Sequence, residues 1–343
     1  MNQHEITERR PLLDERGNLT EPGYAKRLLP VYRRADIKAN PLRVKEWDYY
    51  CVNNGRFARA LTIADNSYLG LDSISLLNLE EGWEITKSPM SAFPMGKVGL
   101  PETSERGDVQ SGGKKYNILF RNEGSKRVLI AQMQNFGPEG SLYAKIELTD
   151  IPEESMVIAT PFRKDKHFYY NQKINCMRAE GWIELGETHI DLKPDQFFAV
   201  LDWGRGVWTY ENTWYWGSAS GELDGVPFGW NLGYGFGNTA AATENVLFYG
   251  GKIHKLGEVT FNIPMKDGKE DYMSPWTFTS DDNRFYMDFL PVLDRSAYTS
   301  ALVISSDQHQ VFGRFTGRIT LDDGTVLPVR DFFGFAEKVV NKW

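Results

Sequence analysis

The stretch that decides the fold is Asn212-Thr-Trp-Tyr-Trp-Gly-Ser-Ala-Ser220. Successive side chains of a β-strand point to opposite faces, so Trp214 and Trp216 share one face while Tyr215 takes the other. The surrounding block, residues 202–238, holds five of the ten tryptophans of the chain. This concentration predicts a strand with one indole-covered face, which lines either a packed core or a ligand cavity.

Outward from this block, the chain consists of short segments rich in β-branched and aromatic residues and bounded by turn formers. They are residues 56–64, 116–121, 127–134, 143–148, 156–162, 197–201, 246–249, 259–263, 284–290, 301–305 and 313–321. Asn54-Gly55 and Asp323-Gly324 supply the positive-φ residues that two-residue hairpin turns require. The pattern predicts an all-β protein, with antiparallel sheets in a sandwich or barrel. The one helical candidate is the stretch 25–34, which Pro30 interrupts.

The chain divides into an N-terminal arm and two strand-rich parts. The arm, residues 1–45, carries four prolines and is expected to pack across the body without forming a domain. A break at residues 148–155, with Pro152 and three acidic side chains, separates the two parts. We therefore predict a first β-domain over residues 46–153 and a second over 154–343, the second carrying the tryptophan-rich block.

Composition excludes several classes of protein. The 39 Lys and Arg against 46 Asp and Glu give a formal charge of −7, which argues against a nucleic-acid partner. No apolar run is long enough for a transmembrane helix, and the start of the chain lacks the basic flank and apolar core of a signal peptide. These features predict a cytoplasmic protein, and they leave the oligomeric state open.

Metal and cofactor signals are weak throughout the chain. Cys51 and Cys176 match no metal or redox spacing and are expected to be buried thiols. The five histidines show no pairing two or four residues apart, so no metal site is predicted. The glycines of residues 233–237 do not join a strand to a helix, so no nucleotide cofactor is predicted either.

Seven motifs together resemble a bacterial family known as a domain of unknown function. They are D-W-G-R-G-V-W (202–208), N-T-W-Y-W-G-S-A-S-G (212–221), G-W-N-L-G-Y-G (229–235), T-E-N (243–245), P-L-L-D-E-R-G (11–17), K-E-W-D-Y-Y (45–50) and Q-V-F-G-R-F-T-G (310–317). More distantly, the chain is similar to the lipocalin-like (calycin) architecture of AttH-type proteins and carotenoid 1,2-hydratases. The resemblance implies two lipocalin-like antiparallel β-barrels or half-open sandwiches behind a proline-rich arm. It implies no reaction, because fold does not determine chemistry.

Asp202 is the candidate general acid. It follows the apolar strand 197–201 and precedes Trp203-Gly-Arg-Gly206, whose glycines allow a tight turn. In a water-poor aromatic pocket, desolvation would raise the pKa of this carboxyl and make it a usable acid. Pairing with Arg205 would instead lower the pKa and make Asp202 one half of a buried structural ion pair. The sequence leaves both alternatives open.

The other candidate residues would bind a ligand. They are Trp203, Arg205, Trp208, Tyr210, Asn212, Trp214, Trp216, Asn231, Tyr234, Asn238, Glu244 and Asn245. Indole faces attract a developing cation, and the polar side chains would orient the ligand in an otherwise apolar pocket. For each of them, core packing or a structural hydrogen bond is the alternative. The same choice applies to Glu46-Trp-Asp-Tyr-Tyr50, which lines a pocket or forms an amphipathic strand.

Two functional hypotheses fit an apolar pocket for a lipid or isoprenoid-like molecule. In the first, the protein is a cofactor-independent hydratase, cyclase or isomerase that acts on a C=C bond. Asp202 would donate the proton, and Trp208, Trp214 and Trp216 would shelter the cation. In the second, the protein carries or sequesters the same ligand and catalyses no reaction. A carboxylate that points into the cavity without an arginine partner would favour the enzyme.

Overall fold

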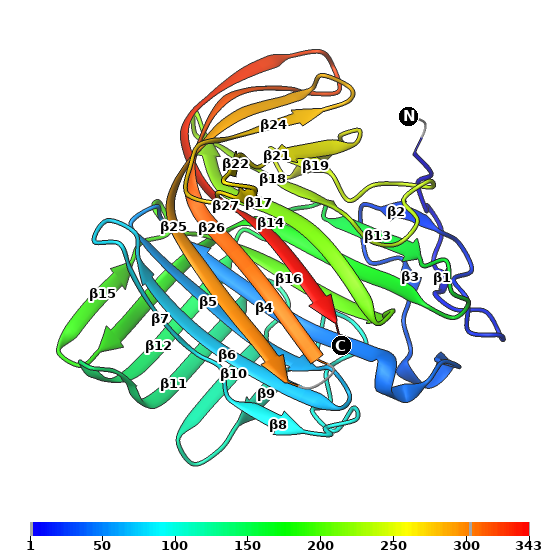
Figure 1. Cartoon of the computed structure of the whole chain (residues 1–343), viewed down its shortest axis with the longest axis horizontal. Helices are drawn as coiled ribbons and strands as arrows, with labels where there is room; N and C mark the ends of the chain where they lie inside the picture. The colour runs from blue at the N-terminus through cyan, green and yellow to red at the C-terminus, as the bar shows by residue number, and fades with distance from the viewer. Residues whose placement is uncertain (1–2, 302–303, 343) are drawn as a thin grey trace.

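Alternation of inward and outward side chains along successive strands produces two large curled antiparallel sheets (Figure 1). The computed structural model describes residues 3–301 and 304–342. Within them, the helical elements are the 3-10 turns η1 (Arg34–Asp36) and η2 (Pro41–Arg43), and no helix is long and apolar enough to cross a membrane. The all-β prediction is confirmed.

The first sheet has fourteen strands in the described residues. Ten follow one another in the order β7 (Trp83–Lys87), β6 (Leu69–Asn78), β5 (Phe57–Asp65), β4 (Val44–Asn53), β16 (Phe198–Val207), β14 (Phe168–Leu185), β12 (Gly140–Thr149), β11 (Arg127–Gly137), β10 (Tyr116–Asn122) and β9 (Val109–Gly112). Four more pair beside this path: β2 (Gly23–Ala25), β8 (Met90–Ala92), β13 (Met156–Pro161) and β15 (Thr188–Leu192). The sheet curls around an apolar core built from its inward side chains.

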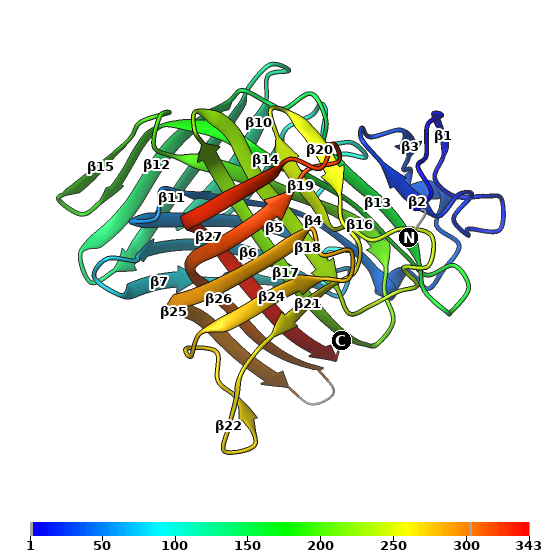
Figure 2. The same cartoon turned by 90° about the horizontal axis from the view of Figure 1, so that it is seen from above.

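The second sheet has nine strands in the described residues. Their order is β20 (Lys252–Lys255), β19 (Val246–Tyr249), β18 (Val226–Tyr234), β17 (Glu211–Leu223), β27 (Val326–Lys342), β26 (Ile304–Thr320), β25 (Phe285–Ala301), β24 (Trp276–Ser280) and β21 (Val259–Asn262). A small hairpin, β22 (Met265–Lys266) with β23 (Lys269–Glu270), leaves its edge. Figure 2 shows the long strands β25 and β26 crossing in front of the first sheet. Of the predicted strand 301–305, residues 302 and 303 lie outside the described residues.

The N-terminal arm lies against the first sheet. Its strands β1 (Arg10–Pro11) and β3 (Pro30–Val31) pair in parallel, and β2 extends the first sheet by pairing with β13. Apolar side chains of the arm, among them Leu12 and Tyr32, join the first core. The helix considered for residues 25–34 does not form there. Pro30 lacks the N–H that a helix interior needs, and the segment takes short strands instead.

The chain passes from the first sheet to the second between Val207 and Glu211, where β16 ends and β17 begins. The segment 156–207 therefore pairs with the first sheet, because β13 and β16 both flank β14. The division into domains at residues 153 and 154 stays a prediction, and the sheets themselves divide about fifty residues later.

Candidate functional site

A cavity of about 470 Å³ lies between the two sheets. Its floor is the outer face of β4 to β7, and its other walls come from β14 and β16 and from β17, β25, β26 and β27 of the second sheet. The volume falls in the range of pockets that hold drug-sized molecules. Neither sheet's own core contains this cavity, because each core is filled by packed side chains.

Strand alternation explains how β4 serves both regions. Lys45, Trp47 and Tyr49 face the cavity, whereas Glu46 and Asp48 point into the first core. The segment 46–50 is thus an amphipathic strand whose outer side chains line the cavity. Both predicted roles, pocket lining and amphipathic strand, apply to it.

Trp208 is the centre of an aromatic cluster at one end of the cavity. Its ring centroid lies 5.6 Å from that of Trp47 and 5.4 Å from that of Trp214, and both pairs meet edge to face. Phe236 and Tyr169 complete the cluster at 5.0 and 5.9 Å. Such contacts are worth about 0.5 to 1.5 kcal/mol per pair beyond burial, so the cluster is a stable wall.

Two glycines of the D-W-G-R-G motif make room for these indoles. A Cβ added to Gly204 would lie 2.0 Å from Cζ2 of Trp47, and one on Gly206 would lie 3.0 Å from Nε1 of Trp208. The glycines therefore provide a flat backbone surface beneath the two rings, which is a close approach that only glycine permits.

Asp202 forms its ion pair with a lysine. The Nζ of Lys173 lies 2.7 Å from Oδ1 of Asp202, and Nδ2 of Asn171 donates to the same oxygen at 2.6 Å. The proposed pair of Asp202 with Arg205 is wrong: Arg205 donates to Oδ1 of Asp48 at 3.0 Å. Residues three apart on one strand point to opposite faces, so Asp202 faces the cavity and Arg205 faces the first core.

Trp203 points into the first core together with Arg205. Trp203 is fully buried, and the guanidinium of Arg205 lies 4.3 Å from its ring centroid. Arg205 also donates to the backbone oxygen of Pro101 at 2.8 Å. Neither side chain lines the cavity, so their roles here are structural.

Trp216 lines the cavity, but one of its faces is occupied. The ammonium group of Lys173 lies 4.1 Å from its ring centroid, and its Nε1 donates to Oδ1 of Asn231 at 2.8 Å. A substrate cation would compete with Lys173 for this face. Trp216 thus holds the ammonium group of Lys173 against the cavity wall.

Glu337 is one of the cavity residues that the sequence analysis missed, together with Lys173 and Arg295. Its Oε1 accepts from Nε1 of Trp214 at 2.9 Å, and its Oε2 accepts from Nε2 of Gln310 at 3.1 Å. Burial raises the pKa of this carboxyl to about 7, against an ordinary value of 4.5. A signal was present in the sequence: Glu337 takes a position between Phe335 and Val339 where strand alternation calls for an apolar side chain.

Glu244 is a second buried carboxyl in the cavity wall. Its Oε2 accepts from Nδ2 of Asn231 at 3.2 Å, and burial raises its pKa. Gly233 makes space for it, because a Cβ there would lie 2.3 Å from the Glu244 carboxyl. Of the polar residues proposed in the sequence analysis, Glu244 is the one that borders the cavity beside Asp202.

Three of the other predicted polar residues make structural contacts instead. Asn231 joins Trp216 to the backbone oxygen of Glu244. Asn245 accepts from the N–H of Gly233 at 2.7 Å. The ring of Tyr234 stacks on Tyr215 with centroids 4.5 Å apart.

Three more lie away from the cavity. Asn212 exchanges hydrogen bonds with Thr209 at the start of β17. Asn238 is exposed and accepts from the N–H of Ala240 at 3.1 Å. Tyr210 is also exposed, and its ring lies 5.9 Å from the guanidinium carbon of Arg43.

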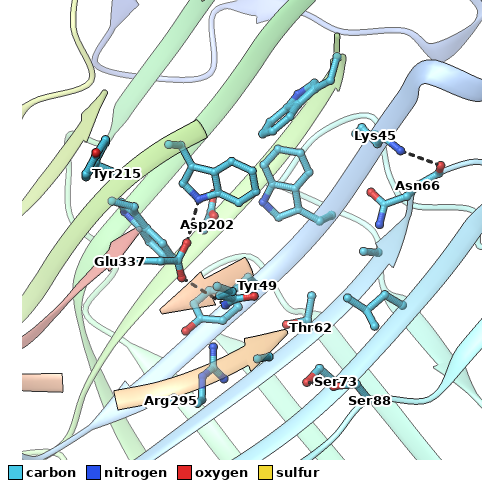
Figure 3. Close-up of a pocket in the computed structure, with 18 of the residues that line it drawn as sticks. Lys45, Tyr49, Thr62, Asn66, Ser73, Ser88, Asp202, Tyr215, Arg295 and Glu337 are labelled. Atoms are coloured by element: carbon cyan, nitrogen blue, oxygen red, sulfur yellow. Dashed lines mark hydrogen bonds between the residues drawn. The ribbon is translucent and has the colours of Figure 1, made fainter. Parts of the chain in front are cut away.

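The other end of the cavity is rich in hydroxyl groups. Figure 3 shows Thr62, Ser73 and Ser88 grouped near Arg295. The Ser73 and Ser88 hydroxyls lie 3.0 Å apart, and Nη1 of Arg295 donates to Oγ of Ser75 at 2.8 Å. The cavity is therefore amphipathic, with indoles at one end and hydroxyls with a guanidinium at the other. The prediction was an otherwise apolar pocket with polar side chains from residues 202–245, and the hydroxyl groups and Arg295 at this end were not among them.

Metal ligands and thiols are not part of this arrangement. Across residues 3–301 and 304–342, no group of three or more His, Cys, Asp and Glu side chains is placed to hold a metal ion. Cys51 and Cys176 are buried and free, and burial raises their pKa values.

Fold and site together define a two-sheet, lipocalin-like protein with a cavity at the junction of its sheets. The chain belongs to the DUF2804 family, described as a domain of unknown function, and the match spans residues 3–343. No curated protein sequence matches it.

Two solved structures are similar to the chain. Kievitone hydratase from Nectria haematococca matches with a TM-score of 0.53 and 10% identity, over 97% of this chain and 98% of that one. A protein of Nitrosomonas europaea described as a candidate AttH matches with a TM-score of 0.48 and 11% identity, over 90% and 95%. At these identities the likeness concerns the fold, and the first match confirms the predicted architecture.

Proposed function

We propose that this protein is an enzyme that adds water to, or shifts, a C=C bond of a small amphipathic molecule, with Glu337 as the proton donor. The observation that carries the proposal is the buried Glu337 carboxyl, which lines the cavity and has a pKa of about 7. A general acid works best when its pKa is close to the working pH.

Glu337 replaces Asp202 as the proton donor for a physical reason. Asp202 forms a 2.7 Å ion pair with the ammonium of Lys173, whereas the side chains that donate hydrogen bonds to the Glu337 carboxyl are the neutral Trp214, Gln308 and Gln310. In this proposal Asp202 neutralises Lys173 and holds it over Trp216.

The reaction balances within the cavity. Protonated Glu337 gives its proton to one alkene carbon, and the π electrons form the new C–H bond. The other carbon becomes cationic beside the faces of Trp208 and Trp214, which favour a positive charge. The oxygen of a water molecule then bonds to this carbon, and the excess proton returns to the Glu337 carboxylate. Loss of a proton from a neighbouring carbon, in place of water attack, would shift the double bond.

The fold is compatible with such a reaction, because the structurally similar kievitone hydratase is a hydratase by name. This likeness concerns the fold alone, and we infer the reaction from the residues that line the cavity. Non-catalytic binding of a hydrophobic ligand remains the competing function, and the following experiment separates the two.

The test uses geraniol, oleic acid and a prenylated phenol as probes, each incubated with the protein in H₂¹⁸O. We expect the wild type to convert at least one probe to a product heavier by one labelled water, or to an isomer, by mass spectrometry. Glu337→Gln keeps the shape and removes the titrating proton, so it should lose about a hundredfold or more of this rate.

Glu211→Gln is the matched control, because Glu211 is an exposed residue of the same sheet whose partner is Lys342. It should turn over like the wild type. Binding of every probe without conversion would support the carrier function instead, and full activity of Glu337→Gln would exclude Glu337 as the acid.

A further inference from the structure

The basic side chains Lys173 and Arg295 both line the cavity, but they differ in whether an acidic side chain lies beside them. Lys173 has Asp202 at 2.7 Å. Arg295, on β25, has no carboxylate oxygen within 4.0 Å among the side chains that the structure describes, and one hydroxyl, that of Ser75, accepts from it. A guanidinium carries five N–H donors in a planar fork that matches a carboxylate.

Glu84, the acidic side chain at this end of the cavity, forms no ion pair with Arg295 among the side chains that the structure describes. Glu84 lines the same end of the cavity, but its Oε2 accepts from the Thr86 hydroxyl at 2.7 Å. The hydroxyl oxygens of Ser75 and Thr86 lie 2.9 Å apart, and because Thr86 gives its one proton to Glu84, Ser75 donates in this bond. The hydroxyl row therefore fixes one side of the guanidinium and leaves its other donors to the cavity.

Arg295 also lies close enough to the acid to influence it. Its positive charge lowers the pKa of Glu337, in opposition to the larger effect of burial. An anion held on Arg295 would cancel this influence and keep Glu337 protonated while the ligand is bound. The indole end, about Trp208, remains available for the apolar body of the same ligand.

We infer that the ligand of this cavity is an amphipathic molecule with an anionic oxygen group, such as a carboxylate, and that Arg295 binds this group. The inference refines the proposed function and depends on it only for the choice of cavity. It replaces the plain hydrocarbon lipid with an acidic one, whose ring or prenyl body packs on the indoles.

Two fluorescent dyes of almost the same shape test the inference. 1-Anilinonaphthalene-8-sulfonate carries one anionic group, and N-phenyl-1-naphthylamine is its neutral counterpart. We expect the wild type to bind the sulfonate at least about tenfold more tightly, because hydrogen bonds to a charged group are stronger than those between neutral groups. Arg295→Gln should remove this preference and leave the affinity for the neutral dye unchanged.

Controls locate the binding and separate charge from structure. Arg314→Gln changes an exposed arginine of β26 paired with Asp331, and it should keep the preference. Ala64→Trp fills the cavity floor and should weaken both dyes. Arg295→Lys keeps the charge and should retain part of the preference, which covers the case in which Arg295→Gln does not fold.

Equal affinities of the two dyes for the wild type would overturn the inference. So would a preference that survives Arg295→Gln, a loss of both dyes in that variant with the fold intact, or sulfonate binding that survives Ala64→Trp. Because no readout involves turnover, failure of the proposed reaction leaves this test intact. Equal affinities of the two dyes for a wild type that turns over its substrate would reject the anion site alone.

Discussion

The Nζ of Lys173 lies 2.7 Å from Oδ1 of Asp202, and both side chains are almost completely buried. The pair joins β14 to β16 on the face that meets the second sheet. Two charges removed from water must balance one another, so each is expected to depend strongly on its partner.

A double-mutant cycle tests this pair. Lys173→Met should lower the free energy of unfolding by about 3 to 5 kcal/mol, because it removes the ion-pair partner of the buried Asp202 carboxyl. Adding Asp202→Asn should recover part of this loss, whereas Arg205→Gln and Asp202→Asn should act almost additively. Urea unfolding of the variants measures each term. Stronger coupling of Asp202 to Arg205 than to Lys173 would contradict the structure.

Glu337 makes stability depend on pH. Its pKa is about 7 in the folded chain against an ordinary 4.5, so its contribution is complete below about pH 4.5 and is lost as the pH rises to about 7. Each unit of pKa difference corresponds to about 1.4 kcal/mol, which gives about 3 kcal/mol in all.

Glu337→Gln, which cannot ionise, should therefore gain about this amount relative to the wild type between pH 5 and pH 8.5. Urea unfolding at the two pH values measures the change, and Glu211→Gln should show none. A difference between wild type and Glu337→Gln that stays constant with pH would refute the raised pKa.

Trp214→Phe removes the N–H that donates to Glu337 and keeps an aromatic ring. That hydrogen bond stabilises the charged carboxylate, so the pKa of Glu337 should rise above its wild-type value. Infrared titration of the carboxyl C=O band, isolated by subtraction of the Glu337→Gln spectrum, reports this pKa. Trp182→Phe, whose indole stacks on His189, should leave the midpoint in place. An unchanged midpoint in Trp214→Phe would argue against the contact.

Gly204→Ala places a methyl group 2.0 Å from the indole of Trp47 and should displace that ring. We expect a loss of about 1 to 3 kcal/mol in stability and weaker binding of N-phenyl-1-naphthylamine. Gly113→Ala is the control, because no atom lies within 4 Å of its added Cβ. Wild-type dye affinity in Gly204→Ala would show that Trp47 does not shape the site.

Period-two alternation accounts for the parts of the site that were predictable. It places Trp214 and Trp216 on one face of β17, and both line the cavity. The same rule places Asp202 and Arg205 on opposite faces of β16 and so argues against their pairing. It also marks Glu337 as a charged residue in an apolar position.

The sequence by itself determined the all-β class, the hairpin turns and the aromatic face of the central strand, because these depend on neighbouring residues and on backbone geometry. Only the tertiary structure decided that the cavity lies between the sheets. It also decided that Arg295, Glu337, Lys173 and Asp202 line the same cavity. These residues come from β25, β27, β14 and β16, and strand alternation cannot say which distant faces pack together. That choice depends on how two curled sheets bury their remaining apolar surface against each other.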